Sequence, residues 1–438
     1  MKGPPRLNTS ILLFLVLRWR LSLQTRGRHL KQMTNRFIDR NILLSSARCC
    51  AILCLICVID RSVVFAESHL TSNSGALTDF VSFWASSRIL IDGGNPFSPL
   101  EVLELQRSLG LSETKPLMIW HPPWTLSLLL PFGAMPFQFS QFCWLLMQIF
   151  FILLSAQTLW TIYCRDAAPN AYWPWIAAFT LIPTWLVLII GQMSPLILLG
   201  IVGFLHFQRK NQLYLAGAST VIISIKPHLF YLFWIGLILW LWKQRYWRIA
   251  VGAIVAGLIV AVIPLIIDPA VYQQFIDLYR FPGQSTPFNL PAPSLGSLLT
   301  LYVPHGNLPI QFLPPLVGSL WFLWHWHKHK ELWNWYEQIP LMLLASLTCS
   351  AYAWTYDQVI LLPAVVHGFV MVKRHSDSWY KSAPGLLYIA ANGCYFAGKL
   401  FVTKDSYYFW LAPVFLLIYL GACTFSRSSN SPTPVKIA

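Results

Sequence analysis

The sequence predicts an all-α polytopic membrane protein, and three observations support this fold class. Hydrophobic residues make up 56% of the chain, charged residues make up only 11%, and the mean hydropathy is +0.55. Soluble domains carry about 25% charged residues. Apolar segments recur almost to the C-terminus, and basic residues gather at alternate turns between them. We therefore expect a bundle of about 12 transmembrane helices and no soluble domain.

Residues 1–41 form a basic segment that we expect to stay in the cytoplasm. The stretch 1–48 contains ten Lys and Arg against one acid, Asp39. Such a segment is retained on the cytoplasmic side and can lie on anionic lipid. Its apolar run 11–17 is too short to span and lacks a small-residue cleavage site, so we do not interpret it as a secretory signal. The net charge of +15 therefore indicates membrane topology, and no nucleic-acid partner is expected.

Residues 42–425 are expected to form one transmembrane domain, and residues 426–438 a cytoplasmic tail. A span usually needs about 20 apolar residues, and several segments are shorter because Pro or Gly interrupts them. The apolar piece 122–134 is either a half-depth hairpin or one true span. The expected spans lie near 43–65, 139–163, 172–190, 192–207, 212–225, 228–242, 249–267, 309–326, 339–354, 357–372, 384–401 and 407–425.

The turns without basic clusters are expected to face outward, and polar residues collect in them. The first long outward loop, 66–118, holds six acids, and a second long loop covers 268–308. Shorter outward turns lie at 191–195, 226–228 and 353–358. The positive-inside rule places all of these on the side opposite the basic turns. Any chemistry is therefore expected at the extracytoplasmic face of the cell membrane.

Asp79 stands in the first turn of a predicted helix in the first outward loop. Thr78 can cap this helix, and Gly93–Gly94 end it. Phe80 and Phe83 recur near helical spacing, so we expect an amphipathic helix that lies at the membrane surface with its apolar side down. An acid in the first turn either complements the helix dipole or takes part in chemistry, and the helical pattern alone leaves both open.

Two short outward turns carry polar residues at membrane depth. Lys226, in "SIKPHLF", has no acid near it in the sequence, and an ionisable residue at this depth indicates a function. Together with His228 it would suit a phosphate at the lipid surface, although a Lys can also extend to the lipid headgroups. Gln192, in "GQMSP", is either a ligand contact or a simple turn residue.

Aromatic residues accompany the other outward polar groups. His121, in "WHPPW", either hydrogen-bonds a substrate or lies among interfacial aromatics. Tyr356, Asp357 and Gln358 form a "YDQ" motif, and rings beside a carboxylate and an amide suit a sugar. An aromatic belt with a capping Asp is the alternative. The motif "HWHKHK" at 325–330 has no suitably spaced Cys or carboxylate, so no metal site is expected.

The order of these motifs resembles that of glycosyltransferase family 87. Its best-known members are polyprenol-phosphate-mannose-dependent α-1,2 mannosyltransferases of the GT-C superfamily. The resemblance extends from about residue 42 to the late spans and omits the basic N-terminal segment. It rests on the Asp-Phe pair of the first loop, "GGNPF", "HPPW…LLLPFGAMPF", "GQMSPLILLG", "AGASTVIISIKPHLF" and the late "YDQVILLP".

The resemblance implies a GT-C type bundle that acts as an inverting hexosyltransferase on the extracytoplasmic face. It implies a polyprenyl-phosphate sugar, expected to carry mannose, as co-substrate, a glycan or glycolipid as acceptor, and no other cofactor. By motif position, Asp79 fits the general base. In the mechanism that we expect, Lys226, helped by His228, holds the donor phosphate. We expect substrate contacts from Arg88, Asn95, His121, Gln192, Tyr356, Asp357 and Gln358.

Two points leave the function open at this stage. The late turn has "TYDQ" where the best-known mannosyltransferases carry a His-rich stretch, which leaves the sugar and the acceptor undecided. A transporter or flippase for a lipid-linked sugar is the alternative, because it too would combine many helices with polar groups at broken helices. The absence of a half-to-half repeat and the gathering of polar groups on one face favour the transferase.

Overall fold

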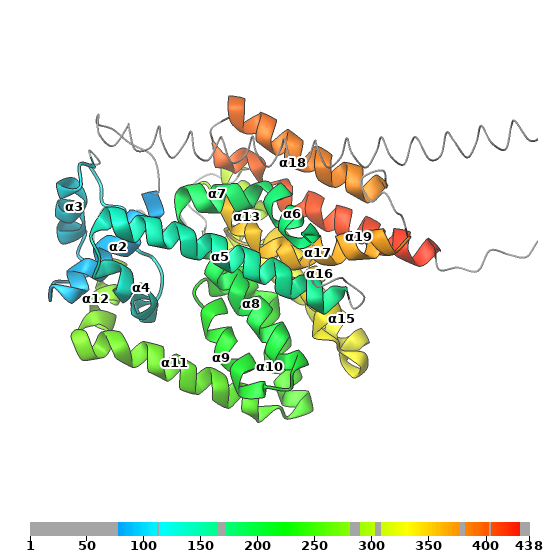
Figure 1. Cartoon of the computed structure of the whole chain (residues 1–438), viewed down its shortest axis with the longest axis horizontal. Coiled ribbons are helices and arrows are strands. Elements are labelled where there is room, and N and C mark those ends of the chain that lie inside the picture. The colour runs from blue at the N-terminus through cyan, green and yellow to red at the C-terminus, as the bar shows by residue number, and fades with distance from the viewer. Residues whose placement is uncertain are drawn as a thin grey trace, which may run out of the picture. The chain divides into compact units, whose positions relative to one another are not determined.

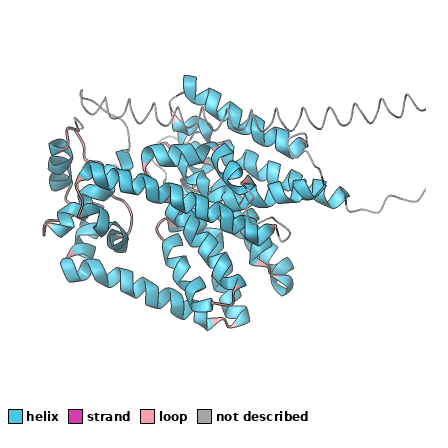
Figure 2. Ribbon diagram, in the orientation of Figure 1, coloured by secondary structure: helices cyan, strands magenta, loops and turns pink. Residues whose placement is uncertain are grey.

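The computed structural model describes residues 78–111, 114–164, 172–280, 290–302, 308–375, 382–402 and 404–429. Contacts divide the chain into two units, Met1–Ser72 and Asn73–Ala438, and all of the described residues belong to the second. Every regular element in the described ranges is a helix, with no strand among them (Figure 2). The prediction of an all-α protein is therefore confirmed. The predicted basic segment 1–41 and the predicted span near 43–65 lie outside the described residues.

The first outward loop and the segment that follows it form short helices that pack on one another. These helices are α2 (Thr78–Ile91), α3 (Pro99–Ser108) and α4 (Leu126–Gly133), which follows the 3₁₀ turn η1 (Pro123–Thr125). α4 contacts α2, α5 and α11, and it rises only about 12 Å at 1.5 Å per residue. The apolar piece 122–134 is therefore a short helix packed inside the protein and is not a full span.

The predicted amphipathic character of α2 is wrong. The helix buries its apolar residues Phe80 and Phe83, but it also buries Ser82 and Ser87. Gly133 lets α4 approach α2 closely at Ser87, since a Cβ added at Gly133 would lie 2.6 Å from the Ser87 Cβ. Protein therefore covers α2 on almost all sides, and its aromatic side chains belong to the core instead of lying on the membrane surface.

Four segments within the described ranges are long and apolar enough to cross a membrane. They are α5 (Phe137–Tyr163), α11 (Trp247–Ile267), Thr355–Arg374 and Asp405–Ser426. A fifth results if α6 (Trp173–Thr180) and α7 (Ile182–Ile190), which meet at a bend of 70°, count as one broken span. These helices support membrane-protein character, whereas the predicted number of about 12 spans is not confirmed.

Prolines and glycines explain why the other apolar segments give shorter helices. α8 (Ser194–Arg209) and α9 (Leu213–Ile223) are apolar but shorter than a usual span. Proline stands in the first turn of α7, α8 and η2, where its missing N–H costs nothing. The remaining elements are η2 (Pro227–Phe230), α10 (Tyr231–Gln244), α12 (Val271–Leu278), α13 (Leu295–Tyr302), α14 (Leu308–Gln311), α15 (Leu313–His329), η4 (Lys330–Leu332), α16 (Trp335–Thr348), η5 (Thr355–Leu361), α17 (Leu362–His375), α18 (Ala383–Phe401), η7 (Asp405–Tyr408) and α19 (Leu411–Ser429).

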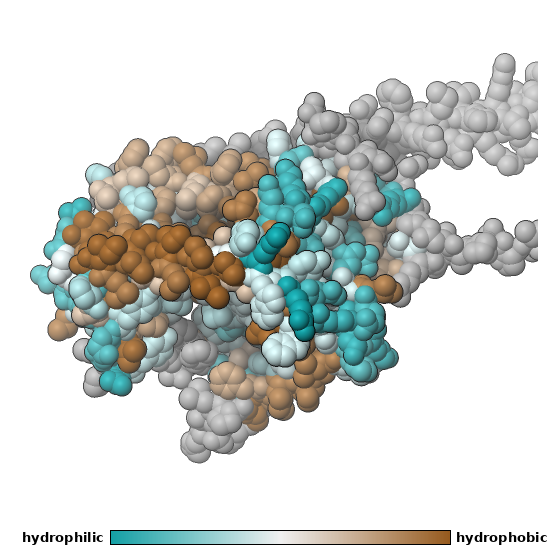
Figure 3. All heavy atoms as spheres, turned by 90° about the horizontal axis from the view of Figure 1, so that it is seen from below, coloured by the Kyte–Doolittle hydropathy of each residue, from teal (hydrophilic) through white to brown (hydrophobic). Residues whose placement is uncertain are grey.

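α9 and α11 cross in close contact through two glycines. A Cβ added at Gly217 would lie 2.0 Å from the Ile249 carbonyl oxygen, and one added at Gly252 would lie 2.0 Å from the Tyr214 carbonyl oxygen. Small residues let helix backbones approach in this way inside membranes. α11 also carries exposed apolar side chains, which form the long brown strip in Figure 3, and we expect this strip to face lipid. It includes Val251, Ile254, Val255, Leu258, Ile259 and Val262.

The 3₁₀ segment η5 lies inside the bundle and leads directly into α17. All of its residues are buried, and it contacts α7, α8, α16 and α17. Figure 1 shows α5 running from the region of α2 and α4 past α8 toward α16. Helices from distant parts of the sequence therefore surround η5, and this arrangement positions the site described next.

Candidate active site

Four breaks in the helical structure bring polar side chains into the interior of the bundle. α7 ends at Gly191, whose φ of +78° is a left-handed conformation that glycine tolerates. Pro195 then stands in the first turn of α8. Pro227 begins η2 after the end of α9. The start of α2 supplies Asp79, the turn between α7 and α8 supplies Gln192, the break between α9 and η2 supplies Lys226, and η5 supplies Asp357. These four side chains form one connected site.

A continuous series of hydrogen bonds joins Asp79 to Asp357. Gln192 Nε2 donates to Asp79 Oδ2. Lys226 Nζ donates to Gln192 Oε1 at 3.0 Å and to Asp357 Oδ1 at 2.7 Å. Four residues that were predicted from separate motifs therefore form a single polar network. The three short outward turns expected on one side of the membrane are adjacent in space.

The ion pair between Lys226 and Asp357 lies inside the protein, with these residues only 4% and 1% exposed. Ser194 Oγ donates to Asp357 Oδ1 at 2.6 Å, and the Trp354 backbone N–H donates to Oδ2 at 3.3 Å. Buried charges are costly unless they are paired and hydrogen-bonded, and both conditions hold here. Lys226 therefore does not extend to lipid headgroups, because its counter-charge lies within the protein.

Two side chains of α5 support the network by bonding the turn between α7 and α8. Trp144 Nε1 donates to the Gly191 carbonyl oxygen at 2.8 Å, and Gln148 Nε2 donates to the Gln192 carbonyl oxygen at 2.6 Å. Both α5 residues are buried. They hold the turn between α7 and α8 through its backbone, which leaves the Gln192 amide free to bridge Asp79 and Lys226. Trp144, Gln148 and Ser194 were not among the predicted site residues, and of the three only Ser194 lies within a recognised motif, "GQMSP".

Lys226 and His228 retain polar atoms that a ligand could use. An ammonium has three N–H donors, and Lys226 donates two of them within the network. Its Nζ also lies 5.1 Å from the centre of the Tyr356 ring, at a cation–π distance. The His228 ring stacks on Tyr352 at 4.6 Å, and its buried Nε2 has no hydrogen-bond partner among the described residues.

His121 lies beside the same site as a neutral group. Its ring packs edge-to-face on Phe83 at 5.4 Å, and its buried Nδ1 has no partner in the described part of the chain. Burial lowers the pKa of His121 well below its ordinary value of 6.5, and the positive charge of Lys226 lowers it further. A neutral imidazole can both donate and accept a hydrogen bond, as a sugar hydroxyl requires.

Residues 120–351 of the chain match the family model of glycosyltransferase family 87. The match covers more than half of the chain and includes His121, Gln192, Lys226 and His228. The chain belongs to glycosyltransferase family 87. It is therefore an enzyme, a membrane glycosyltransferase. Membership of the chain in the GT-C superfamily is consistent with this family. No curated protein and no solved structure gives a significant match to the chain.

Several predicted site residues of this family 87 member lie outside the network. Arg88 Nε donates to Asp92 Oδ2 at 2.8 Å on an exposed part of α2. Asn95 accepts the Phe97 N–H at 2.9 Å and so stabilises a turn. Gln358 is buried next to Asp357, and its Oε1 has no hydrogen-bond partner among the described residues. The structure therefore unites the predicted residues of the four breaks, but it does not bring Arg88 and Asn95 to them.

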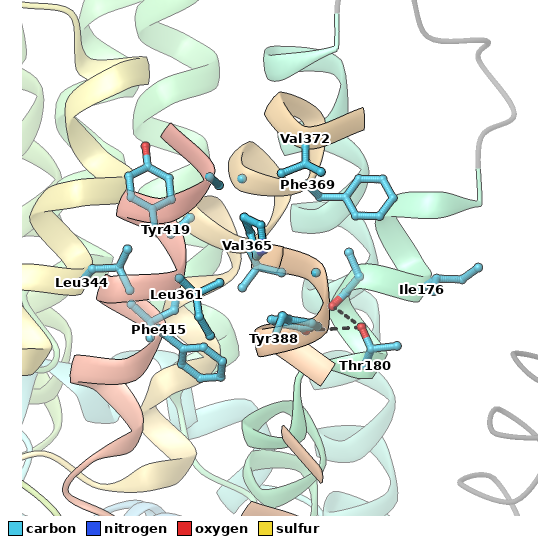
Figure 4. A pocket seen from close by; sticks show the side chains of 17 residues that line it. Ile176, Thr180, Leu344, Leu361, Val365, Phe369, Val372, Tyr388, Phe415 and Tyr419 are labelled. Atoms are coloured by element: carbon cyan, nitrogen blue, oxygen red, sulfur yellow. Dashed lines mark hydrogen bonds between the residues drawn. The ribbon is translucent and has the colours of Figure 1, made fainter. Parts of the chain in front are cut away.

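Two other features of the family 87 fold lie apart from the network. In "HWHKHK", His325 Nε2 bonds Gln338 Oε1 at 2.7 Å, and no set of three or more potential metal ligands gathers in the described ranges. An apolar cavity of about 70 Å³ lies among α6, α16, α17, α18 and α19 (Figure 4). In its wall the Thr180 hydroxyl contacts the Tyr388 hydroxyl at 3.3 Å and the Ala177 carbonyl oxygen at 3.2 Å, and no lining residue is a carboxylate or a basic side chain.

Proposed function

We propose that this enzyme transfers a hexose, expected to be mannose, from a polyprenyl-phosphate donor to a glycan or glycolipid. The proposed site of transfer is the extracytoplasmic face of the cell membrane. The observation that carries the proposal is that one amide, Gln192, connects the carboxylate of Asp79 to the ammonium of Lys226. Sugar transfer from a lipid phosphate needs a base for the acceptor and a cation for the leaving group. Both groups are present at the two ends of this amide.

The proposed reaction is a single displacement with inversion at the sugar. The acceptor hydroxyl oxygen attacks the anomeric carbon while the bond from that carbon to the phosphate oxygen breaks. The proton of the hydroxyl passes to Asp79. The electron pair of the broken bond stays on the polyprenyl phosphate, where the remaining N–H of Lys226 and the ring of His228 stabilise the developing charge.

The other residues of the network have supporting roles in this proposal. Asp357 acts through Lys226, whose ammonium it fixes at 2.7 Å. Gln192 holds the base and the cation at a constant separation. His121 and Tyr356 are proposed to contact the sugar, because a neutral imidazole and an aromatic ring suit its polar edges and apolar faces. Contacts of substrate with Arg88, Asn95 and Gln358 stay predictions.

The decisive experiment compares wild type with Asp79→Asn in the full chain, purified into nanodiscs. The assay supplies radiolabelled polyprenyl-phosphate mannose together with short glycans and glycolipids as acceptors. A general base contributes about 10²- to 10⁴-fold to a rate, so Asp79→Asn should lose transfer by that factor and keep its thermal stability. Asp277→Asn is the matched control, because Asp277 pairs with Arg280 at an exposed position that has no proposed role. Transfer by Asp79→Asn at the wild-type rate would remove the base from the proposal.

The donor is tested in the same assay. Polyprenyl-phosphate glucose, polyprenyl-phosphate mannose and a nucleotide-linked mannose are supplied in turn. The proposal expects transfer only from a polyprenyl-phosphate sugar, with mannose preferred. Efficient use of the nucleotide sugar would overturn the lipid-linked donor, while preference for glucose would correct the sugar alone.

A further inference from the structure

A second cavity, with a polar wall, lies between the far ends of the helices that build the active site. Its volume is about 390 Å³. The ends of α5, α8 and α17 and the start of α16 surround it. Its polar wall includes Tyr163, Arg209, Asn334, Tyr336, His367 and Arg374.

This cavity is distant from the network of Asp79, Gln192, Lys226 and Asp357. On α5, Gln148 supports the network and Tyr163 lines the cavity; on α8, Ser194 bonds Asp357 and Arg209 lines the cavity. In each helix the two residues are separated by about four turns, which is roughly 22 Å. The same helices therefore carry one polar site at each end. The second cavity lies at the end where basic turns predict the cytoplasm.

Two guanidinium groups converge on this cavity from different helices. Arg209 Nη1 donates to the Thr161 carbonyl oxygen at 2.7 Å, and Arg374 Nη2 donates to the Tyr163 carbonyl oxygen at 3.0 Å. Each guanidinium has five N–H donors, so these contacts with the end of α5 use only part of its capacity. Neither group is within ion-pair distance of a carboxylate in the described part of the chain.

The single carboxylate in the cavity wall does not neutralise the two arginines. Glu337 is exposed, and its Oε1 accepts from Asn334 Nδ2 at 3.2 Å. The wall therefore carries two cations against one anion that is bonded elsewhere. An arrangement with excess guanidinium donors favours an anionic ligand with several acceptor oxygens.

A buried hydroxyl in the wall supports the same conclusion independently. Tyr163 is only 7% exposed, yet its hydroxyl has no hydrogen-bond partner among the described residues. Its ring stacks on His367 at 4.6 Å, and His367 Nδ1 lies 2.9 Å from the Tyr419 hydroxyl. The stack fixes the Tyr163 ring, so the hydroxyl cannot turn to solvent without breaking this packing. A buried hydroxyl without a partner is costly, and a bound ligand would satisfy it.

We propose that this cavity is a second ligand site, which binds a phosphate monoester. Arg209, Arg374 and Tyr163 offer donors from three different helices, and a phosphate monoester presents three terminal oxygens. The remaining volume accommodates the group that carries the phosphate. Such a phosphate is supplied either by an anionic lipid headgroup or by a soluble metabolite. The proposal does not depend on the sugar donor or on the base, because it concerns the opposite end of the bundle.

The test uses the full chain in nanodiscs of neutral phosphatidylcholine and two phosphate probes. In one arm, glycerol 3-phosphate is titrated against the protein, with glycerol as the uncharged control. In the other arm, the nanodiscs contain phosphatidic acid. The measured quantities are the shift in the thermal unfolding midpoint and the protection of Arg209 and Arg374 from phenylglyoxal, mapped by peptide mass spectrometry. Saturable protection by either probe is the expected result, and the arm that gives it identifies a soluble or a lipid source.

Variants test ligand binding separately from the hydrogen bonds that the two arginines donate to the end of α5. Arg209→Gln and Arg374→Gln should each weaken phosphate binding by at least about tenfold relative to their own ligand-free baseline. Tyr163→Phe keeps the ring stack and both arginines, and it should weaken binding about fivefold. Arg248→Gln, at an exposed position outside the cavity, should bind as wild type does. Protection by neither probe, or an equal loss in Arg248→Gln, would overturn the proposal.

Discussion

Lys226 Nζ lies 2.7 Å from Asp357 Oδ1, although 131 residues separate the two along the chain. Both side chains are almost completely buried. Two charges at this depth are tolerated because each compensates the other and because Gln192, Ser194 and the Trp354 N–H complete their hydrogen bonds. The pair therefore has a structural role in addition to the role proposed for Lys226 in transfer.

Neutralising the pair in two steps separates these roles. Lys226→Met leaves Asp357 as an uncompensated buried charge and should lower the free energy of unfolding by about 3–5 kcal/mol. The double variant Lys226→Met/Asp357→Asn removes both charges and should recover most of this loss, but it should not transfer sugar. Thermal unfolding and transfer rate are measured on the same samples. Lys243→Met is the control, since its partner Glu331 is 75% exposed. Transfer by the double variant would show that the pair serves stability alone.

Replacing the bridging amide tests whether the base and the cation must be held together. Gln192→Leu removes the bonds to Asp79 and Lys226 while Asp79 and Lys226 themselves remain. The transfer rate at saturating donor should fall at least about tenfold, which corresponds to roughly 1.4 kcal/mol. Gln273→Leu is the control, because this amide is exposed and bonds Asp277, which lies outside the network. A rate equal to wild type would mean that Gln192 is a turn residue.

The sequence supports the fold class and the gathering of polar turns because both depend on local properties. Composition identifies membrane helices, and the distribution of Lys and Arg places turns on one side or the other. The partner of Lys226 could not be predicted in this way. Pairing with Asp357 depends on how α9, η2 and η5 are rotated against one another, and no periodicity within one segment contains that information. For the same reason the support from Gln148 was missed.

The error at α2 has a different physical cause. Phe80 and Phe83 recur near helical spacing, and this pattern predicts an amphipathic surface helix. In the structure, Ser82 Oγ donates to the Asp79 carbonyl oxygen at 2.7 Å and Ser87 Oγ donates to the Phe83 carbonyl oxygen at 2.8 Å. A serine that bonds its own helix can be buried at little cost. The predicted number of about 12 spans is not confirmed, because within the described ranges Pro and Gly break several apolar segments into helices shorter than a bilayer.

The neutral state of His121 predicts a loss of stability in acid. Burial lowers the pKa of His121 in the folded protein below its ordinary value of 6.5, so below that pH the unfolded chain binds a proton that the folded protein does not. Stability should therefore fall as the pH decreases below 6.5, by up to about 1.4 kcal/mol per pH unit from this group. His121→Gln should lose part of this dependence. Thermal unfolding between pH 7.5 and 5 measures it, with His327→Gln as an exposed control. Identical pH dependence in wild type and His121→Gln would contradict this prediction.

The crossing of α9 and α11 should tolerate no side chain at Gly252. A Cβ at this position would lie 2.0 Å from the Tyr214 carbonyl oxygen, so Gly252→Ala must push two helix backbones apart. Overpacking of this kind costs about 1–3 kcal/mol, and here the obstacle is backbone that cannot rotate away. Gly257 on the same helix is the matched control, because a Cβ there would meet only Val221 Cγ2 at 3.9 Å. Gly257→Ala should keep or raise stability, since alanine favours helix by about 1 kcal/mol over glycine. The two variants differ only in the distance to α9, so equal unfolding midpoints would show that the crossing is not held at this separation in the membrane.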